Sequence, residues 1–504
     1  MGRDGPGDHA AGAASPLVVE RVLEGRLQRD PTEPVAALPF EVPPGATRID
    51  LGYAHAEGNV LDLGLLDPRA TPFVSRAGFR GWSGGARREA FVAIEDATPG
   101  YLPGPLPSGT WQVLLGRAKV APEGCAYRVD VRVTLGGSNP TAVAASATAT
   151  ASAEPTPVED PDPLAPDAAW YPGDLQSHTH HSDAKGSVAE LLVAAEERGL
   201  RFLAVTDHNT ISHHADLRRH ADGPVLPVPG LEVTTYRGHA NVWGASDWVD
   251  FRITGEADVA AMARRAHELG GLVSVNHPKT QPGCIGCDWT YDVPGEADAL
   301  EAWQGPWWLR NWESLARYDA LVANGRRLTL VGGSDRHQPA GVDLDPDELR
   351  VGSPTTWLRL QTVAVPDVLA ALRAGQASVS ESPSGPFVRI EASTTPMGGT
   401  LPKRAEHELR AVVRGGAGDL LRWVGARGVV REVAIDRERF TDAWFWRPDG
   451  AFVRAEVVAS AAGRARRLEA LRALVAGRTL PFGLTLDEVD AHPWVRALSN
   501  PIYV

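Results

Sequence analysis

The sequence has few cysteines, no long apolar run and no excess of positive charge. Its 504 residues include only three cysteines, too few for a framework of disulfides. No run of about 18 apolar residues occurs, so no membrane-spanning helix is expected. The 50 basic residues are outnumbered by 63 acidic ones, and this net charge of −13 argues against a nucleic-acid or anionic-membrane partner. Because residues 1–16 lack the apolar core of a signal peptide, we expect a cytoplasmic protein.

The composition changes along the chain and divides it into five segments. Residues 1–16 are rich in Gly and Ala and are expected to be disordered. In residues 17–138, short β-like runs such as YRVDVRVTL alternate with Pro/Gly turns, which predicts a β-sandwich-like domain. Residues 139–168 form an Ala/Thr/Pro/Asp-rich linker. Residues 169–382 alternate strand and helix patterns, and residues 383–504 return to β-like runs that predict a small C-terminal β domain with one helix.

The alternating pattern of residues 169–382 predicts an α/β fold. A capping box begins one helix at Ser187, with Glu190 three residues later. Apolar strands such as FLAVT, LVSVN and LTLV are separated by helical patterns, as in a parallel sheet. The number of units favours a barrel over an open sheet, and in a barrel the carboxyl ends of the strands meet at one mouth.

Histidines concentrate in this segment, where 11 of the 15 lie between residues 178 and 337. Those that follow apolar strands are candidate metal ligands, together with acids in similar positions: His178, His208, Glu232, His239, His277, Asp335 and His337. Imidazole and carboxylate together suit Zn, Mn or Fe, and several carboxylates favour a multinuclear cluster. Four other histidines fall on helical patterns and are not expected to bind metal: His213, His214, His220 and His267.

Seven segments taken in order resemble the PHP (polymerase and histidinol phosphatase) metallohydrolase superfamily, and within it the CehA/McbA-like branch. They are GDLQSHTHHSDA, FLAVTDHNT, PGLEVTT, GHANVWG, VSVNHP, EAWQGPWW and VGGSDRH, and NPIYV near residue 504 also resembles that branch. The resemblance implies a distorted (βα)7 barrel, here flanked by the two β domains. It also implies two or three divalent transition-metal ions at the mouth of the barrel.

The first motif of the superfamily, D-L-H-x-H-T-x-x-S-D-G, can be aligned on Ser182 and Asp183. His178 then matches the second histidine, and Gln176 stands where the superfamily has the first. In the other register, His178 and His180 match the two histidines of the motif, but Asp174-Leu175 and Ser182-Asp183 no longer align with its D-L and S-D. The resemblance implies three metal positions: Gln176, His178 and Asp335 around the first, Glu232 bridging to a second with His239 and His277, and Asp183, His208 and His337 around the third.

Gln176 is a departure from the superfamily pattern. An amide oxygen is a weaker ligand than imidazole, so the first position is expected to bind metal weakly, to remain empty or to take a harder ion. Ala184 in place of the common glycine is a smaller change. A catalytically weak or inactive PHP-like binding protein is therefore an alternative to an enzyme.

The implied reaction is hydrolysis by a metal-activated water. The residues expected to contribute to catalysis are Glu232, Asp335, His277, Lys279 and Arg336, with Asp207 as a further orienting acid. Small-molecule phosphoesters are the first candidate substrates, with Lys279 and Arg336 as phosphate-binding cations.

Carbamates, esters or amides are the alternative substrates, because Trp303, Trp307 and Trp308 would suit an aromatic leaving group, as in the aryl carbamate hydrolases of the branch. Trp312 is expected only to pack. Cys284 and Cys287 are expected to be loop thiols, with redox and ligand roles open. The oligomeric state is not predicted.

Overall fold

The computed structural model describes residues 16–136, 168–338 and 347–504. Within them the chain forms two compact units, one of residues 16–30, 35–70 and 77–136, the other of residues 31–34, 71–76 and the described residues from 168 onward. The predicted disordered N-terminus and the predicted linker fall almost entirely outside the described residues. Among the helices of the described ranges, none has the length and apolar character needed to cross a membrane.

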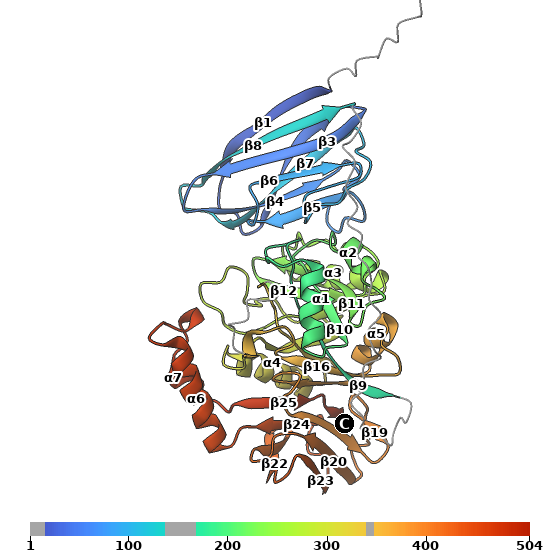
Figure 1. The fold of residues 1–504 in the computed structure, drawn as a ribbon, viewed down its shortest axis with the longest axis vertical. Coiled ribbons are helices and arrows are strands. Elements are labelled where there is room, and N and C mark those ends of the chain that lie inside the picture. Colours follow the sequence, from blue (N-terminus) through green and yellow to red (C-terminus); the bar gives the residue numbers. More distant parts are fainter. Residues whose placement is uncertain (1–15, 137–167, 339–346) are drawn as a thin grey trace, which may run out of the picture. The chain divides into compact units, whose positions relative to one another are not determined.

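The first unit consists of two four-stranded antiparallel sheets (Figure 1). One has the order β1-β8-β3-β6 and the other β2-β7-β4-β5. Alternate residues of a strand face one side, and accordingly Val129, Val131 and Val133 of β8 are at most 1% exposed. Two sheets packed over a shared core have the arrangement of a β-sandwich. The strands are β1 (Leu17–Leu27), β2 (Val35–Val42), β3 (Ala46–His55), β4 (Val60–Leu66), β5 (Phe79–Gly84), β6 (Glu89–Ala93), β7 (Gly109–Lys119) and β8 (Cys125–Leu135).

The second unit is built on a curved sheet in which seven consecutive strands are neighbours, from β9 to β15. Beyond the ends of β9 and β15, Ser177 and Arg336 form a parallel bridge, so the first and last strands meet at their carboxyl ends. The mixed α/β class is confirmed; we call these seven strands the ring, and the distorted (βα)7 barrel stays a prediction. The strands are β9 (Ala169–Asp174), β10 (Phe202–Val205), β11 (Leu226–Thr235), β12 (Gly238–Trp243), β13 (Leu272–Val275), β14 (Ala299–Gln304) and β15 (Thr329–Gly333).

One strand of this ring departs from the predicted parallel arrangement. β12 runs antiparallel to both β11 and β13. The reason is the short connection between Thr235 and Gly238, because a parallel partner would need a crossover of a dozen or more residues. The prediction of an entirely parallel sheet is therefore wrong at β12.

Helices connect several strands of the ring: α1 (Val188–Glu197), α2 (His214–Arg219), α3 (Glu256–Glu268) and α4 (Asn311–Ala323). The predicted capping box of α1 is present, with Ser187 N donating to Glu190 Oε2 at 2.7 Å and Glu190 N donating to Ser187 Oγ at 3.2 Å. In α3, Val259, Met262 and Ala266 are buried on one face, as their spacing predicts.

The remaining strands of the second unit extend the central sheet and add a second one (Figure 1). The order β9-β16-β17-β25-β24-β21-β22 continues the sheet that contains the ring. A four-stranded sheet has the order β19-β18-β20-β23. These elements are β16 (Thr355–Leu360), α5 (Val365–Arg373), β17 (Ala377–Ser380), β18 (Phe387–Ala392), β19 (Thr395–Pro396), β20 (His407–Arg414), β21 (Leu420–Gly425), β22 (Gly428–Ala434), β23 (Arg439–Trp446), β24 (Phe452–Val458), α6 (Ala461–Val475), α7 (Leu486–Asp490), β25 (Val495–Ser499) and β26 (Ile502–Tyr503), with short 3-10 turns η1 (Asp347–Leu349) and η2 (Pro481–Gly483).

Residues near position 500 are bound directly to β15. The side chain of Asn500 accepts a hydrogen bond from Leu330 N at 2.7 Å and donates one to Leu330 O at 2.8 Å. Tyr503 donates its hydroxyl hydrogen to Leu328 O at 3.0 Å. β15 is therefore held on one side by β14 and near its start by the segment around Asn500.

Candidate metal centre

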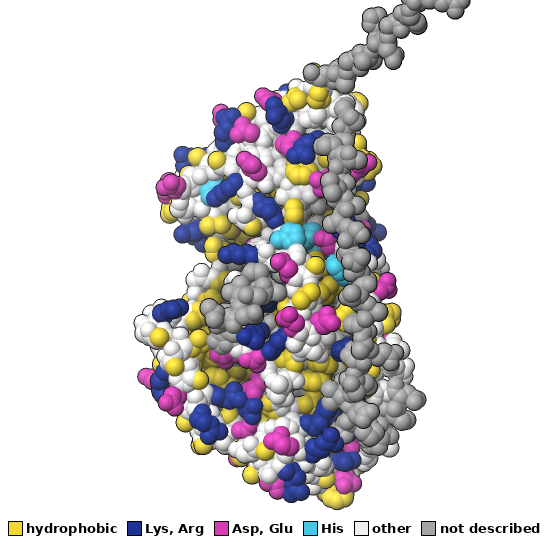
Figure 2. Space-filling model, viewed as in Figure 1, with side chains coloured by type: hydrophobic (Ala, Val, Ile, Leu, Met, Phe, Trp, Pro, Cys, Tyr) yellow, Lys and Arg dark blue, Asp and Glu magenta, His cyan; other side chains and the backbone are white. Residues whose placement is uncertain are grey.

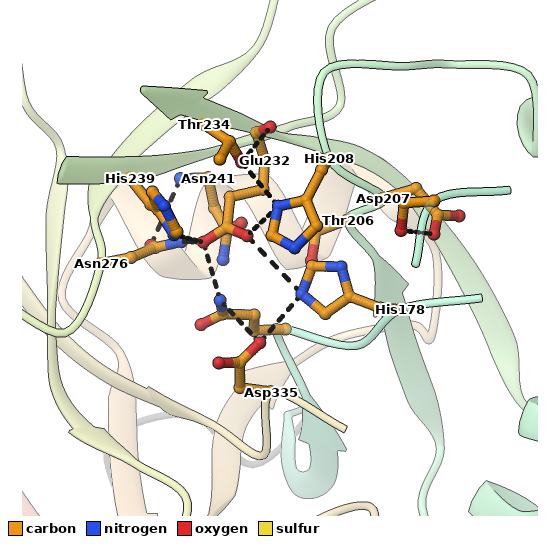
Figure 3. Close-up of polar contacts among 12 residues, drawn as sticks. His178, Thr206, Asp207, His208, Glu232, Thr234, His239, Asn241, Asn276 and Asp335 are labelled. Atoms are coloured by element: carbon orange, nitrogen blue, oxygen red, sulfur yellow. Dashed lines mark hydrogen bonds and ion pairs between the residues drawn. The ribbon is translucent and has the colours of Figure 1, made fainter. Parts of the chain in front are cut away.

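The predicted ligands converge at the carboxyl ends of the ring strands (Figure 3). Three overlapping groups of side chains have potential ligand atoms within 4.8 Å of one another. We call them the first group (His178, Glu232 and Asp335), the second group (Glu232, His239 and His277) and the third group (His178, Asp183, His208 and His337). These histidines and acids fall into the same three sets as the expected positions, except that His178 also joins the third group.

The backbone at these strand ends is unusual. His277 and Asp335 have φ values of 28° and 54°, in the left-handed region that residues with a Cβ rarely adopt. Such conformations cost energy and concentrate at functional sites. Gly333 just before the second turn allows a close approach, because a Cβ there would lie 2.6 Å from the Cβ of Gln176. The backbone at these strand ends therefore directs the side chains of His277 and Asp335 toward the same site.

In the first group, His178 lies between two carboxylates. Its Nε2 is 2.9 Å from Asp335 Oδ1 and 3.6 Å from Glu232 Oε2. Gln176 is fully buried beside them, and its Nε2 donates to Glu232 Oε1 at 2.9 Å and to Asp335 Oδ1 at 3.3 Å. The side chain is therefore where the alignment predicts, but it presents N–H donors to the carboxylates.

In the second group, two imidazoles face one carboxylate oxygen. His239 Nδ1 lies 3.4 Å and His277 Nε2 lies 3.6 Å from Glu232 Oε1. His277 donates its Nδ1 hydrogen to the backbone oxygen of Cys287 at 3.1 Å. In the neutral imidazole this leaves a lone pair on Nε2, directed at the glutamate. A lone pair and a carboxylate oxygen that face each other are arranged as ligands of a shared cation.

The third group has the same character. His337 donates its Nδ1 hydrogen to Asp335 O at 2.9 Å, and its Nε2 lies 3.3 Å from Asp183 Oδ1. His208 Nε2 lies 3.5 Å from the same oxygen. The ring of His178 stacks on those of His208 and His337, with centroids 4.4 and 4.2 Å apart. Asp183 is thus the common carboxylate of this group.

Buried carboxylates and imidazoles balance each other electrostatically. Burial opposes charge on Asp183 and Asp335, but nearby imidazoles outweigh it and hold the pKa of both carboxyls well below their usual range. Burial also opposes charge on His208, yet Asp183 and Glu232 raise the pKa of its imidazole to about 10. Against the same burial effect, Asp183 and Asp335 raise the pKa of His337 to about 9. The centre therefore strongly attracts positive charge.

Orphaned polar atoms test whether the residues fit divalent ions. Among the described residues, the buried side-chain atoms without a hydrogen-bond partner include Glu232 Oε2, His239 Nε2, His178 Nε2 and Gln176 Oε1. Leaving such atoms unsatisfied is costly, and a coordinated cation would satisfy them. Imidazole and carboxylate are the donors that Zn, Mn and Fe prefer. The second and third groups fit divalent transition-metal ions.

Three supporting residues were missed from the sequence. Asn276 donates to Glu232 Oε1 at 2.7 Å, and Gln304 donates to Asp335 Oδ2 at 2.8 Å. There was a reason in the sequence to consider both residues, because Asn276 directly precedes the candidate ligand His277 and Gln304 is the last residue of strand β14. Ser182 binds Asp207 as part of the anchor described next.

Asp207 anchors the loop that carries His178 and Asp183. It is fully buried and accepts hydrogen bonds from Thr179 N at 2.8 Å, Thr179 Oγ1 at 2.6 Å and Ser182 Oγ at 2.6 Å. Its Oδ2 also lies 3.2 Å from His213 Nδ1, so it contacts an imidazole, as expected for an orienting acid, as well as the loop. It fixes the path of the chain between two candidate ligands.

The two cations predicted to bind phosphate, Lys279 and Arg336, both make contacts within the chain. Lys279 is 4% exposed, and its Nζ donates to Asn311 Oδ1 at 2.8 Å and to Gln304 O at 3.2 Å. Burial lowers the pKa of Lys279 to about 7. Arg336 is half-buried and donates from Nη1 to Leu349 O. Both groups are engaged in contacts within the chain, and their role as phosphate-binding cations stays a prediction.

Cys284 and Cys287 form a disulfide, so the prediction of two free loop thiols is wrong. Their Cα atoms lie 5.6 Å apart, a separation typical of disulfides. The sequence offered only a lone C-x-x-C, which does not distinguish thiols from a disulfide. The loop has a direct connection to the centre, because its Cys287 carbonyl holds His277.

The tryptophans divide into packing residues and cavity walls. Trp303 and Trp307 meet edge to face, with ring centroids 4.9 Å apart, and line a cavity of about 440 Å³ together with Trp494. Trp308 is buried and does not line it. Trp312 stacks on His492 at 4.3 Å, consistent with the expected packing role.

The other histidines of this segment lie outside the three groups. His213 and His214 bind backbone oxygens, both reaching Gly230 O. His180 binds Gly186 O through Nδ1, so its place next to His178 in sequence does not bring it into the cluster. These contacts agree with the register in which Gln176 and His178, and not His180, face the centre.

Comparisons with known proteins give structural neighbours only. No protein-family model and no curated protein matches the chain. A two-domain protein from Bacteroides vulgatus, described as containing a predicted PHP-like metal-dependent phosphoesterase, is 18% identical; the match covers 58% of this chain and 91% of that one, with a TM-score of 0.36. A proposed metal-dependent phosphoesterase from Bifidobacterium adolescentis is 15% identical over 36% of this chain and 92% of its own, with a TM-score of 0.25. An amidohydrolase from Chromobacterium violaceum, with bound sulfate and no metal, is 14% identical over 36% and 93%, with a TM-score of 0.24.

PHP-like proteins, the superfamily that the motifs resemble, are thus among the structural neighbours of this chain. The CehA/McbA-like branch is not represented among these neighbours and stays a prediction. At these identities and TM-scores, function is inferred from the geometry of the site itself.

Proposed function

We propose that the chain is a metal-dependent hydrolase with its centre at the carboxyl ends of β9–β15. The observation that carries this proposal is the convergence of buried imidazole nitrogens and carboxylate oxygens from strands far apart in the sequence. Zinc, manganese or iron suits these donors. Two or three such ions would activate a water and polarise the substrate bond that it attacks.

The chain's own residues would keep this chemistry in place. Glu232 belongs to the first and second groups, so its two oxygens can serve neighbouring positions. Asn276 fixes one of these oxygens and Gln304 fixes Asp335. Asp335 Oδ1 and His178 Nε2, 2.9 Å apart, form a pair across which a proton can be held during turnover.

Phosphomonoesters and phosphodiesters are the first candidate substrates, because clustered divalent ions bind phosphate oxygens and stabilise developing charge. Carbamates, esters or amides are the second candidates, and one observation favours them. Lys279 and Arg336, the cations expected to bind phosphate, are engaged within the chain.

A small-molecule substrate also fits the surface charge. On the face drawn in Figure 2, basic and acidic side chains of the described residues are interspersed, without one large basic area. The net charge of −13 points the same way. The cytoplasmic location stays a prediction.

The test is metal content together with a substrate screen. Protein loaded with manganese or zinc is assayed on aryl phosphates, phosphodiesters and aryl carbamates, before and after treatment with a chelator. We expect bound metal, turnover of one class, and loss of turnover with chelator or in His277→Ala. His220→Ala is the matched control and should retain full activity. Protein without metal, or with turnover that survives chelation, would refute the hydrolase and leave a binding protein.

A further inference from the structure

The two carboxylates of the first group are surrounded by amide N–H donors. Gln176 Nε2 donates to Glu232 Oε1 and to Asp335 Oδ1, at 2.9 and 3.3 Å. Asn276 donates to the same Glu232 oxygen at 2.7 Å, and Gln304 donates to Asp335 Oδ2 at 2.8 Å. Gln176 and Asn276 are fully buried, so these are hydrogen bonds to charged acceptors in an interior of low polarity.

This arrangement contrasts with the other two groups. In the second group, the Nε2 lone pair of neutral His277 faces Glu232 Oε1, and in the third group the Nε2 atoms of His208 and His337 converge on Asp183 Oδ1, so both groups offer imidazole nitrogens to a cation. Between Glu232 and Asp335 the Gln176 amide already supplies hydrogens to both acceptors. An N–H group has no lone pair to offer a cation.

We propose that the Gln176 amide takes the place of one cation, so that the centre holds two divalent ions, at the second and third groups. The inference rests on the proposed metal centre and specifies its composition. Asp335 is then an oriented carboxylate beside His178, held by amides on both oxygens, and not a metal ligand. Glu232 Oε1 is then shared between the second group and the amides of Gln176 and Asn276.

The opposite orientation of the amide is disfavoured on physical grounds. Turning Gln176 end for end would direct its Oε1 at two carboxylates and remove both N–H bonds. Hydrogen bonds to charged groups are stronger than those between neutral groups, so the loss of both would be unfavourable. A third ion would have to offset this cost while bound by one imidazole, two carboxylates already shared with other donors, and a weak amide oxygen.

The experiment is a count of bound metal. Wild-type protein and Gln176→His are loaded with excess Zn²⁺, dialysed and measured by elemental analysis against protein concentration. We expect two equivalents in the wild type and three in Gln176→His, because imidazole restores a lone pair where the amide presents hydrogens. Gln176→Leu removes the amide without adding a ligand and should remain at two. Gln112→His, in the first unit, controls for metal bound by any added histidine and should also remain at two.

The outcomes separate this inference from the proposed function. Three equivalents in the wild type, or two in a folded Gln176→His, would overturn the amide substitution while leaving a metal centre. No bound metal in the wild type would overturn the metal centre itself, and this inference with it. If Gln176→His does not fold, anomalous scattering from zinc-loaded wild-type crystals decides: peaks are expected at the second and third groups only, and a peak between Gln176 and Asp335 refutes the proposal.

Discussion

Replacing Asp207 by alanine should destabilise the second unit and weaken metal binding at the third group. The Asp207 carboxylate accepts three short hydrogen bonds from Thr179 and Ser182, all inside the protein. Each buried donor left without a partner costs about 1–3 kcal/mol. Since partial relaxation reduces the sum, we expect a loss of about 3–5 kcal/mol in the free energy of unfolding, as for other buried charged groups that lose a partner.

The effect on metal follows from the same contacts. Thr179 and Ser182 flank the loop between His178 and Asp183, so its release moves two candidate ligands at once. Loss of a supporting partner typically lowers metal affinity about 10- to 100-fold. Asp207→Asn keeps the side-chain volume and one acceptor oxygen, and should give an intermediate loss of both stability and affinity.

Urea unfolding followed by tryptophan fluorescence measures the stability, and zinc titration by calorimetry measures the affinity. Asp436→Ala is the matched control, because Asp436 is an exposed acid paired with its neighbour Arg437. It should change neither quantity measurably. The reasoning is refuted if Asp207→Ala unfolds at the same urea concentration as Asp436→Ala, or if its affinity for zinc is unchanged.

Three further predictions concern other parts of the second unit. Reduction of the Cys284–Cys287 disulfide should weaken metal binding at the second group, because the Cys287 carbonyl that orients His277 belongs to that loop. Calorimetry with and without a dithiol reductant measures the metal affinity, and equal affinities would contradict the prediction. Arg454→Met should cost about 3–5 kcal/mol, since it leaves the acids paired with Arg454 without their buried partner; a urea midpoint equal to the wild type's would contradict it. Burial opposes charge on Asp442, but its bonds to Arg431 and Trp423 lower the pKa of this carboxyl, so its stabilisation is present above about pH 4 and lost as pH falls below that value. Asp442→Asn should show a smaller drop in urea midpoint between pH 7 and about pH 2 than the wild type, and an equal drop would count against it.

Strand-end positions could be predicted from the sequence because periodicity marks where an apolar strand stops. His208 and His277 were placed in this way, and barrel topology then brought them together. The direction of a side chain beyond the strand end depends on contacts from distant segments. Lys279 is drawn inward by Asn311, and nothing in the spacing of the two residues signals that contact.

The amide donors illustrate a second limit on what the sequence can predict about the site. Gln176 was noted as a departure from the superfamily motif, and the motif alone suggested a weak ligand. Whether its oxygen or its nitrogen faces the carboxylates depends on the other donors around Glu232 and Asp335, which come from β13 and β14. The antiparallel course of β12, by contrast, was available from the sequence, since two residues cannot form a crossover.

The attachment of Asn500 to β15 has a consequence for biosynthesis. β15 leads directly into Asp335 and His337, yet its second residue, Leu330, is bonded to a side chain that is translated about 170 positions later. A nascent chain that has just emerged through His337 possesses every candidate ligand but lacks the clamp on the strand that presents two of them. Maturation of the centre would then be a late, post-translational event, and a nonsense mutation shortly before codon 500 would spare all the ligands while compromising the pocket they form.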